Sequence, residues 1–428
     1  MRRESAPHWR LQPRADAARV GAATMNQQTS FKSSAIDVVP NSSSTPFAVA
    51  EELAAVFAQT AAERDRIGGT PKEERDRLRK SGLLRLAIPE ELGGVGASWA
   101  DTMRVVRILA RADSAVAHVF GFHHLLLATA RLFGKKEQWS KLLADTAKHG
   151  WFWGNALNPL DTRSTITKEG SGWIVRGTKS FCSGAKDSDM LIVSALPAGG
   201  GRLVVAAIPT SRAGIRVHDD WDNIGQRQTD SGSVDFDGVA IANDEILDTP
   251  GPLGSVFASL RPCIAQLVLA NVYLGIAEGA FAEARRYTRE QTRPWHTSGV
   301  ARATDDPFIV LRYGKMIVDL RGAELVTDAA AATLDAAWQR EDDLTPEERG
   351  ASSMAIALAK VATTEVGLST TTRMFEVMGA RATSGALRLD RYWRNLRTHT
   401  LHDPVDYKLK DLGNWVLNET LPVPSFYA

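Results

Sequence analysis

The chain has 428 residues, of which 44% are hydrophobic and 24% are charged, and its formal net charge is +1. At roughly 150 residues per domain, this length predicts two or three domains with a large core. The near-zero charge gives no global attraction to nucleic acid or to an anionic membrane, so we expect neither as a partner. The only cysteines, Cys182 and Cys263, cannot form a disulfide framework, which favours a cytoplasmic protein.

The first 45 residues differ in composition from the rest of the chain. They are rich in arginine, lack the apolar stretch of a secretory signal and end in the linker-like run VPNSSSTP. We expect a disordered tail; a transit peptide, or an upstream start codon with Met25 as the true start, stays open as an alternative.

Three segments then carry apolar residues at helical spacing: residues 46–67, 71–89 and 98–134. The last of them predicts two helices, the second so apolar that it must be buried. We assign residues 46–150 to an N-terminal helical domain.

The pattern of apolar residues changes near residue 151. Short β-branched runs at residues 172–184, 189–197, 202–210, 214–221 and 232–241 are separated by Gly, Pro, Asp and Ser. This spacing is typical of a small antiparallel barrel or sandwich, which we place at residues 151–254.

From residue 255 the pattern is helical again. The segments 265–291, 306–341 and 351–379 are long and amphipathic, as in a bundle of long helices or an oligomer core. Residues 255–428 therefore form a predicted helical bundle domain, and the fold class is α+β, mainly α.

Several common sites are missing from the sequence. It has no G-x-G-x-x-G after a strand and no P-loop, which argues against a nicotinamide Rossmann site and against nucleotide hydrolysis. The stretch SGAK, from Ser183 to Lys186, has the S-x-x-K spacing of β-lactamase-like enzymes but lacks their partner motifs.

The stretch RTHTLHDP places His399 and His402 three residues apart, so on a helix they share a face. A metal would require further ligands, and no supporting cluster is visible, so we expect no metal. His118 shares an apolar helix face with Phe122, where a lone histidine is usually a satisfied core residue. Arg293 follows a long helix, as does Arg381; either could satisfy helix carbonyls or bind a phosphate.

The tryptophans of WFWGN and DDW lie at the edges of the β region. An indole ring is often part of a core, but it also makes a flat wall for a planar ligand. Together with the helical segments, they suggest a cleft that could hold a flavin.

The helical–β–helical order and the stretches SGLLRLAIPEELGG, GWIVRGTKSFCSGAKDSDMLIV and GIAEGAFAEARRYTREQTRPW resemble the acyl-CoA dehydrogenase family over residues 46–425. The resemblance implies that fold, with a C-terminal four-helix bundle. His402 and Asp403 stand where the dehydrogenases carry Tyr and their catalytic Glu, and Pro404 follows. We infer that proton abstraction is lost, and keep an FAD-dependent dehydrogenase as an alternative.

The stretches GTKSFCSGAK, AQLVLANVYLGIA and RYWRNLRTHTLHDPVDYK are more similar to the flavin-dependent monooxygenase branch, which includes enzymes that oxidise dibenzothiophene. That resemblance implies a homotetramer that receives reduced FMN (FMNH2) from a separate NAD(P)H:FMN reductase and uses O2 through a C4a-hydroperoxyflavin. The implied substrate is a small aromatic heterocycle, oxygenated at sulfur to a sulfoxide and sulfone. Oxygenation of indole-like rings stays open, because Phe122 replaces a Tyr and Trp153 a smaller residue.

The resemblance also implies site residues. As catalytic groups it suggests His402, His118, Ser183 and Asn155, while His399 is expected to be structural. The implied cofactor site comprises Asn155, Phe181, Ser183, Trp221, Arg293, Arg381, His402 and Asp403, with one of the two arginines coming from a neighbouring subunit. The implied substrate pocket comprises His118, Phe122 and Trp153.

Overall fold

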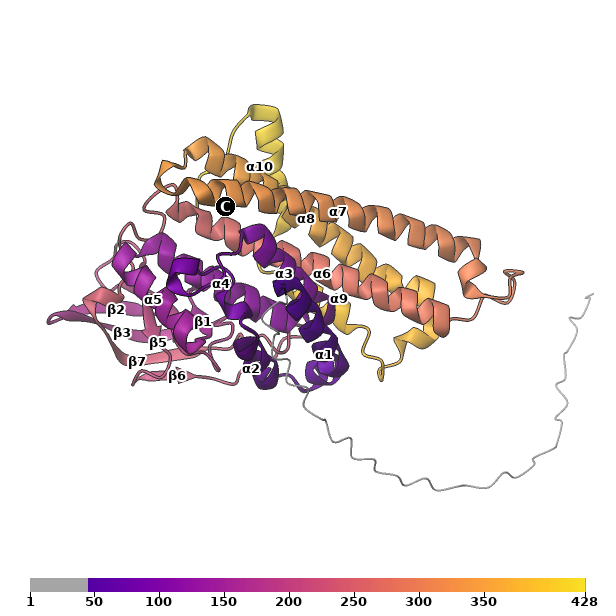
Figure 1. The fold of residues 1–428 in the computed structure, drawn as a ribbon, viewed down its shortest axis with the longest axis horizontal. Coiled ribbons are helices and arrows are strands. Elements are labelled where there is room, and N and C mark those ends of the chain that lie inside the picture. The colour runs from indigo at the N-terminus through magenta and orange to yellow at the C-terminus, as the bar shows by residue number, and fades with distance from the viewer. Residues whose placement is uncertain (1–44, 428) are drawn as a thin grey trace, which may run out of the picture. The chain divides into compact units, whose positions relative to one another are not determined.

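The computed structural model describes residues 45–427, so the predicted tail lies almost entirely outside the described residues. Five helices open the described chain, as the sequence predicted for most of this region (Figure 1). Their bounds are α1 Pro46–Ile67, α2 Lys72–Ser81, α3 Trp99–Ala112, α4 Ser114–Phe133 and α5 Lys136–His149. The fifth was not anticipated, because only Leu143 and Thr146 of α5 are buried and its apolar pattern is weak.

The start of α4 is fixed by its cap. Asp113 accepts hydrogen bonds from the backbone N–H groups of Ala115 and Val116, which satisfies two donors that the first turn leaves free. The same carboxylate forms an ion pair with Arg64 of α1. The capping interaction therefore also links α4 to α1.

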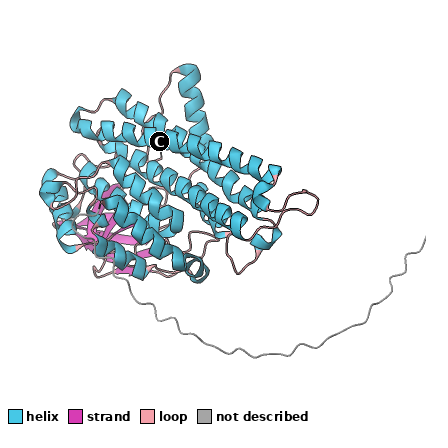
Figure 2. Cartoon of the chain, turned by 45° about the vertical axis from the view of Figure 1, so that its right-hand side comes forward, coloured by secondary structure: helices cyan, strands magenta, loops and turns pink. Residues whose placement is uncertain are grey.

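Seven strands form the middle of the chain (Figure 2). They are β1 Trp153–Ala156, β2 Thr165–Glu169, β3 Gly172–Lys179, β4 Met190–Pro197, β5 Val204–Pro209, β6 Ile215–Val217 and β7 Val234–Ile241. They pair in the order β1-β4-β2-β3-β7-β6. Strand β5 lies off this path and pairs antiparallel with β4.

The prediction of an all-antiparallel sheet was wrong in one respect. Strand β4 runs parallel to β1 and, over two residue pairs, to β2. A parallel pair requires a crossover connection, and the β2–β3 hairpin between β1 and β4 supplies one. Both β1 and β2 are short and were not recognised as separate strands in the sequence.

Alternation along β4 divides its side chains between two cores. Met190 and Ile192 pack into the large core that includes the helices, whereas Leu191 and Val193 pack into the second core of the sheet. Successive residues of a strand point to opposite faces, so a strand buried on both faces is hydrophobic throughout. The sheet is thus covered on one face by the helical part of the chain.

Five helices complete the chain: α6 Arg261–Glu290, α7 Pro307–Arg340, α8 Pro346–Met378, α9 Arg391–Thr400 and α10 Val405–Asn418. The three long ones pack together, and α3 and α4 also contact α6. Among the described residues, α4 and the helical stretch from Ala258 to Glu290 are long and apolar enough to cross a membrane, but 94% and 83% of their apolar windows are buried in the fold.

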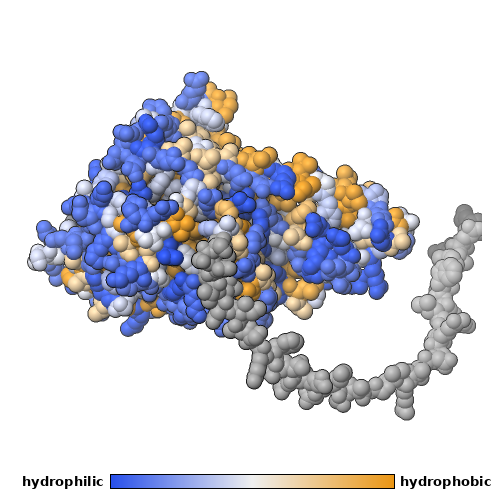
Figure 3. Space-filling view, in the orientation of Figure 1, coloured by the Kyte–Doolittle hydropathy of each residue, from blue (hydrophilic) through white to orange (hydrophobic). Residues whose placement is uncertain are grey.

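One side of α7 is exposed and apolar (Figure 3). Phe308, Leu311, Val318 and Leu325 are 68–71% exposed, at spacings of three and seven residues. Such spacing places them along one stripe of the helix. Gly322 lies in the same stripe, and a Cβ there would meet no atom within 4 Å.

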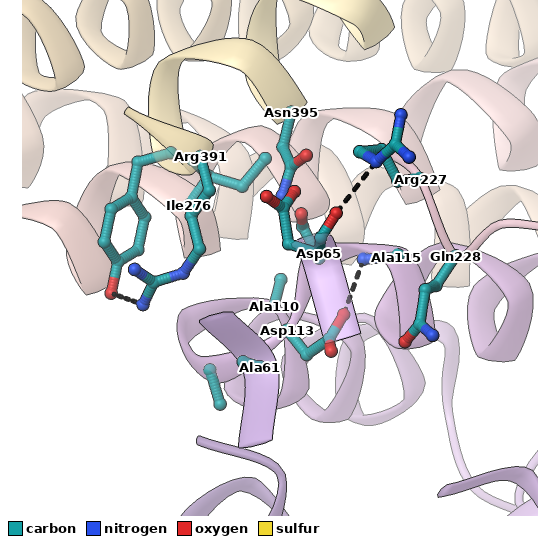
Figure 4. A pocket seen from close by; sticks show the side chains of 13 residues that line it. Ala61, Asp65, Ala110, Asp113, Ala115, Arg227, Gln228, Ile276, Arg391 and Asn395 are labelled. Carbon is teal, nitrogen blue, oxygen red and sulfur yellow. Dashed lines mark hydrogen bonds between the residues drawn. The ribbon is translucent and has the colours of Figure 1, made fainter. Parts of the chain in front are cut away.

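A small polar cavity of about 20 Å³ separates α1, α9 and the loop before β7, a volume suited to about one water molecule. Figure 4 shows Asp65, Arg227, Arg391 and Asn395 around it. Asp65 is 7% exposed, and its Oδ2 accepts hydrogen bonds from Arg388 at 2.8 Å and Arg394 at 2.6 Å. This carboxylate anchors α9 to the N-terminal helices.

Replacing Asp65 with Asn should therefore loosen α9. We expect a loss of about 2 kcal/mol in unfolding free energy, less than for a fully buried pair because both arginines are partly exposed. Urea unfolding measures the loss, and hydrogen exchange over residues 391–400 should accelerate. The control is Asp305→Asn, whose ion pair with Arg302 is exposed to solvent, so its removal should leave the unfolding free energy nearly unchanged. Unchanged exchange in α9 would contradict the anchoring role.

Three histidines of α4 are buried in the core: His118, His123 and His124. Burial, the leading cause, lowers the pKa of His118 to about 3 and of His123 to about 4, and holds the pKa of His124 well below its ordinary value. His123 Nε2 donates to the Leu84 carbonyl at 2.9 Å, while Nδ1 accepts the Trp153 N–H at 3.2 Å. Protonating Nδ1 would break that link between α4 and β1.

Acid should accordingly destabilise the fold. Each of these pKa values is lower in the folded than in the unfolded chain, so the stability is complete above about pH 6.5 and declines as the pH falls toward 4. At pH 5 the expected loss is about 2 kcal/mol for His118 and about 2 kcal/mol for His123. Urea unfolding between pH 7 and 5 measures it. His123→Gln should flatten the dependence, whereas the exposed His296→Gln should not; equal slopes for both would refute the assignment.

Candidate active site

A cavity of about 670 Å³ lies where the three predicted domains meet. This volume falls within the ~300–1,000 Å³ of sites that bind small molecules and cofactors. Its wall combines α4, β1 with the loop that follows it, the loop after β3, the loop before β7, the end of α9 with the turn that follows it, and Tyr427. Of the predicted site residues, it includes His118, Phe122, Asn155, Phe181, Ser183, Trp221 and His402.

A chain of hydrogen bonds runs along one wall. His118 Nε2 lies 3.0 Å from Ser183 Oγ, which lies 2.8 Å from Ser231 Oγ. Ser231 Oγ donates to Thr229 Oγ1 at 2.7 Å, and Thr229 Oγ1 donates to the Gln226 carbonyl at 2.9 Å. All four side chains of this chain are buried.

The carbonyl at the end of this chain determines the direction of every bond in it. A carbonyl oxygen only accepts, so Thr229 must donate to it, and each preceding hydroxyl then donates to the next. His118 Nε2 must therefore carry a hydrogen and donate it to Ser183. Its Nδ1 then has a lone pair, and this atom has no partner among the residues that the structure describes. Since burial lowers the pKa of His118 to about 3, the ring is neutral near pH 7.

The opposite wall is the turn from α9 to α10. His402 is partly exposed, and its Nδ1 lies 3.1 Å from Asp403 Oδ1. His399, expected to be only structural, also lines the cavity: its ring centroid lies 4.6 Å from that of His118, and its Nδ1 has no partner in the described chain. Burial holds the pKa of His399 well below its ordinary value, so two neutral rings face the cavity.

Strained backbone borders the cavity. Phe181, Gln226 and Asp230 all have a positive backbone angle φ, between 53° and 58°, which residues other than glycine rarely adopt. Next to Gln226, Gly225 lies so close to α9 that an added Cβ would be 2.1 Å from the Arg394 carbonyl oxygen. Residues in such conformations persist where the surroundings impose them, and they gather at binding sites.

Aromatic rings supply the apolar part of the wall. Phe122 contacts His118, with ring centroids 4.1 Å apart, and Phe181 meets Trp221 edge to face at 6.0 Å. Phe181 is 59% exposed, which is unusual for a phenylalanine and leaves its ring free to contact a ligand. Trp221 is held in place because its indole N–H donates to the Gln226 carbonyl at 2.8 Å.

Two predicted residues do not line the cavity. Trp153 is 1% exposed, and its indole N–H donates to Thr146 at 2.9 Å, so its ring is part of the core between α5 and β1. Asp403 is buried behind the turn, where it contacts His402 and Lys360.

The two predicted phosphate ligands lie elsewhere as well. Arg293 and Arg381 are exposed at adjoining helix ends, where Thr292 donates to the Met378 carbonyl at 3.1 Å. Within a single chain, these arginines do not reach the cavity wall.

The structure adds wall residues that the sequence did not single out: Asn158, Gln226, Thr229, Ser231, Arg397 and Tyr427. Arg397 lies two residues before His399 and supplies a guanidinium. Polar loop residues such as Thr229 and Ser231 had no distinguishing pattern, although the run QRQTDSGS is unusually polar between strands.

Three family models match the chain: the acyl-CoA dehydrogenase N-terminal domain over residues 47–149, the middle domain over residues 154–239 and the C-terminal domain over residues 267–407. The probable FMNH2-dependent monooxygenase SfnC of Pseudomonas putida is 58% identical, covering 89% of this chain and 97% of SfnC.

Two solved structures are also similar. The methanesulfinate monooxygenase MsuC of Pseudomonas fluorescens is 56% identical with a TM-score of 0.89, covering 90% of this chain and 100% of MsuC. The FMN-bound dibenzothiophene monooxygenase TdsC of Paenibacillus sp. A11-2 is 43% identical with a TM-score of 0.86, with the same coverage. The chain therefore belongs to the acyl-CoA dehydrogenase family and is a flavin-dependent monooxygenase within it.

Proposed function

We propose that this chain is the oxygenase component of a two-component system that uses FMNH2 and O2 to oxygenate the sulfur of a small organosulfur compound. The observation that carries the proposal is the cavity wall, where two neutral histidines lie beside apolar rings: His118 presents Nδ1 as an acceptor, and Nδ1 of His399 has no partner in the described chain. Such a site can orient a hydrogen-bearing group while keeping water away from it.

The residues present fit a flavin. Buried polar atoms normally have hydrogen-bond partners, yet in the described chain Nδ1 of His118, Nδ1 of His399 and Oε1 of Gln226 have none. All three residues line the cavity, so a polar ligand would satisfy them. Phe181 and Trp221 offer rings against which a planar isoalloxazine can pack. Asn155 and Ser183 would lie along its polar edge.

Reduced FMN, when bound, supplies the electrons with which O2 is activated for the transfer of one oxygen atom. His118 would accept a hydrogen bond at Nδ1 and so hold a proton at a defined place. His402, the more exposed histidine, would exchange protons with solvent while Asp403 retains the hydrogen on Nδ1. Phe122, Phe181 and Trp221 would exclude water.

Two sulfur substrates deserve comparison, because both expose a sulfur lone pair. MsuC is named for methanesulfinate and TdsC for dibenzothiophene, and TdsC was also solved with indole bound. The higher identity to MsuC and SfnC favours a small alkanesulfinate beside the dibenzothiophene-type heterocycle that the sequence first suggested. Oxygenation of an indole-type ring is the alternative reaction.

The first test is an assay of the chain with FMNH2, O2 and methanesulfinate, dibenzothiophene or indole. We expect a sulfonate from the sulfinate or a sulfone from dibenzothiophene, with one atom of ¹⁸O from ¹⁸O2 per transfer. His402→Gln should reduce the rate at least about 100-fold, as for loss of a general acid or base, while hydrogen peroxide replaces product. A wild-type rate in that variant would contradict the proposed role of His402. Oxidation of indole but of neither sulfur compound would contradict the proposal that the substrate is oxygenated at sulfur.

A second test addresses the tautomer of His118. Ser183→Ala removes the acceptor of the Nε2 hydrogen and lets the ring adopt either tautomer. A loss of about tenfold in product per FMNH2 is expected, the equivalent of roughly one hydrogen bond. Ser188→Ala serves as the control, because Ser188 is bonded to Thr210 and not to the chain ending at His118. Equal effects would contradict the proposal.

We also propose a homotetramer, supplied with FMNH2 by a separate NAD(P)H-dependent reductase and located in the cytoplasm. The apolar stripe of α7 supports self-association, since long exposed apolar faces are typical of subunit interfaces. Arg293 and Arg381, exposed and outside the cavity of their own chain, are suited to bind the FMN phosphate of a neighbouring subunit.

Placing a charge in that stripe should separate the subunits. Val318→Glu and Leu325→Glu should reduce the solution mass, measured by light scattering, from four chains to two or one, because a buried carboxylate has no partner there. Ile67→Glu, at an exposed apolar residue at the end of α1, should leave the mass unchanged. A tetramer that persists in both α7 variants would exclude this face as the interface.

A further inference from the structure

A fully buried ammonium lies behind His399, at the end of α9, and His402, in the turn from α9 to α10. Lys360, on α8, is 1% exposed, and its Nζ lies 3.3 Å from Asp403 Oδ1 and 3.2 Å from the hydroxyl of Tyr273 on α6. The same Nζ is 4.8 Å from the centroid of the Tyr273 ring. Burying a lysine is costly unless it is paired, so a specific interaction must hold it there.

The carboxylate of Asp403 connects Lys360 to the cavity. Its Oδ1 receives both the Lys360 ammonium and, at 3.1 Å, Nδ1 of His402. Burial alone would raise the pKa of Asp403, but His402 and Lys360 outweigh it and hold this pKa below its usual range. An ionised carboxylate only accepts, so His402 Nδ1 keeps its hydrogen and Nε2 is the atom that can exchange a proton.

Tyr273 connects Lys360 to the other histidine. Its hydroxyl donates to the His399 backbone carbonyl at 2.7 Å, so its oxygen accepts from Lys360. One ammonium thus supports the turn at both ends: at His399 through a backbone carbonyl, and at His402 through a carboxylate.

We propose that Lys360 is a positioning residue, which holds the His399–His402 turn in the cavity wall and sets the proton affinity of His402 through Asp403. The consequence for catalysis rests on the proposed function, in which His402 exchanges protons. The positive charge opposes the pull of Asp403 on the His402 proton. Without it, the carboxylate would stabilise the imidazolium more strongly.

Other charges also act on His402. The neutral rings of His118 and His399 also face the cavity, and behind His402 are the charged groups of α8 and α10, Lys360 and Lys408. Tyr427 contacts the His402 ring with centroids 6.2 Å apart. Burial lowers the pKa of Lys360 to about 8 even though Asp403 opposes the shift, so its charge is retained at neutral pH.

The experiment measures the pKa of His402 in the flavin-free chain. Diethyl pyrocarbonate modifies neutral imidazole, and fragmentation of the tryptic peptide 398–408 distinguishes His402 from His399. In Lys360→Met, the pKa of His402 should rise by about one unit or more, the shift expected for removal of a nearby like charge. With substrate and FMNH2, the acid limb of the rate profile should move upward equally.

The matched control is Lys179→Met, which also removes a buried ammonium, one that donates to the Asn158 and Asp161 carbonyls and not to Asp403. It should leave the pKa of His402 unchanged. A folded Lys360→Met chain, judged by circular dichroism, with a wild-type pKa at His402 would overturn the proposal.

If Lys360→Met does not fold, Lys360→Met combined with Asp403→Asn should, because neutralising both members of a buried pair is tolerated better than removing one. In that double variant the pKa of His402 should lie below wild type; failure to fold, or an unchanged pKa, would overturn the proposal. A wild-type chain that oxygenates no organosulfur compound would end the proposed function alone, since modification of His402 requires neither flavin nor substrate.

Discussion

The burial of α4 is the constraint on which the rest of the structure depends. This helix packs against α3, α5, α6 and β1, so the buried His118 and His123 find their hydrogen-bond partners in other parts of the fold. The β domain supplies Ser183 to His118 and the Trp153 N–H to His123, and α1 supplies Arg64 to the capping Asp113. Correct pairing of these groups therefore aligns the helical and β domains, and the cavity forms at their junction.

Helix length and period explain why most of the fold could be predicted. The segments that became α1, α6, α7 and α8 keep an apolar spacing over 22 to 34 residues, which leaves little choice of structure. The parallel pairing of β1 with β4 could not be predicted in this way. It depends on which strand edges meet in space, and a four-residue strand carries almost no pattern of its own.

The fold brings some of the predicted site residues to one cavity and leaves others outside it, and the division has a physical basis. His118, Ser183 and His402 stand in stretches long enough to resemble a family, and the fold brings all three to one cavity. Trp153 was misassigned because alternation along β1 directs its indole into the core, where Thr146 accepts its N–H. Thr229 was missed because its role depends on a bond to the Gln226 carbonyl, which a sequence does not reveal.

The hydroxyl chain from His118 has a further consequence, because it ends at a backbone carbonyl. A proton wire must terminate in a group that can release a proton to solvent and take up another, and an amide carbonyl does neither. Ser183, Ser231 and Thr229 thus orient the imidazole of His118, but they cannot conduct a proton to solvent. Protons that pass between the cavity and bulk water must therefore take another route. The half-exposed His402 on the opposite wall is the histidine placed to exchange them.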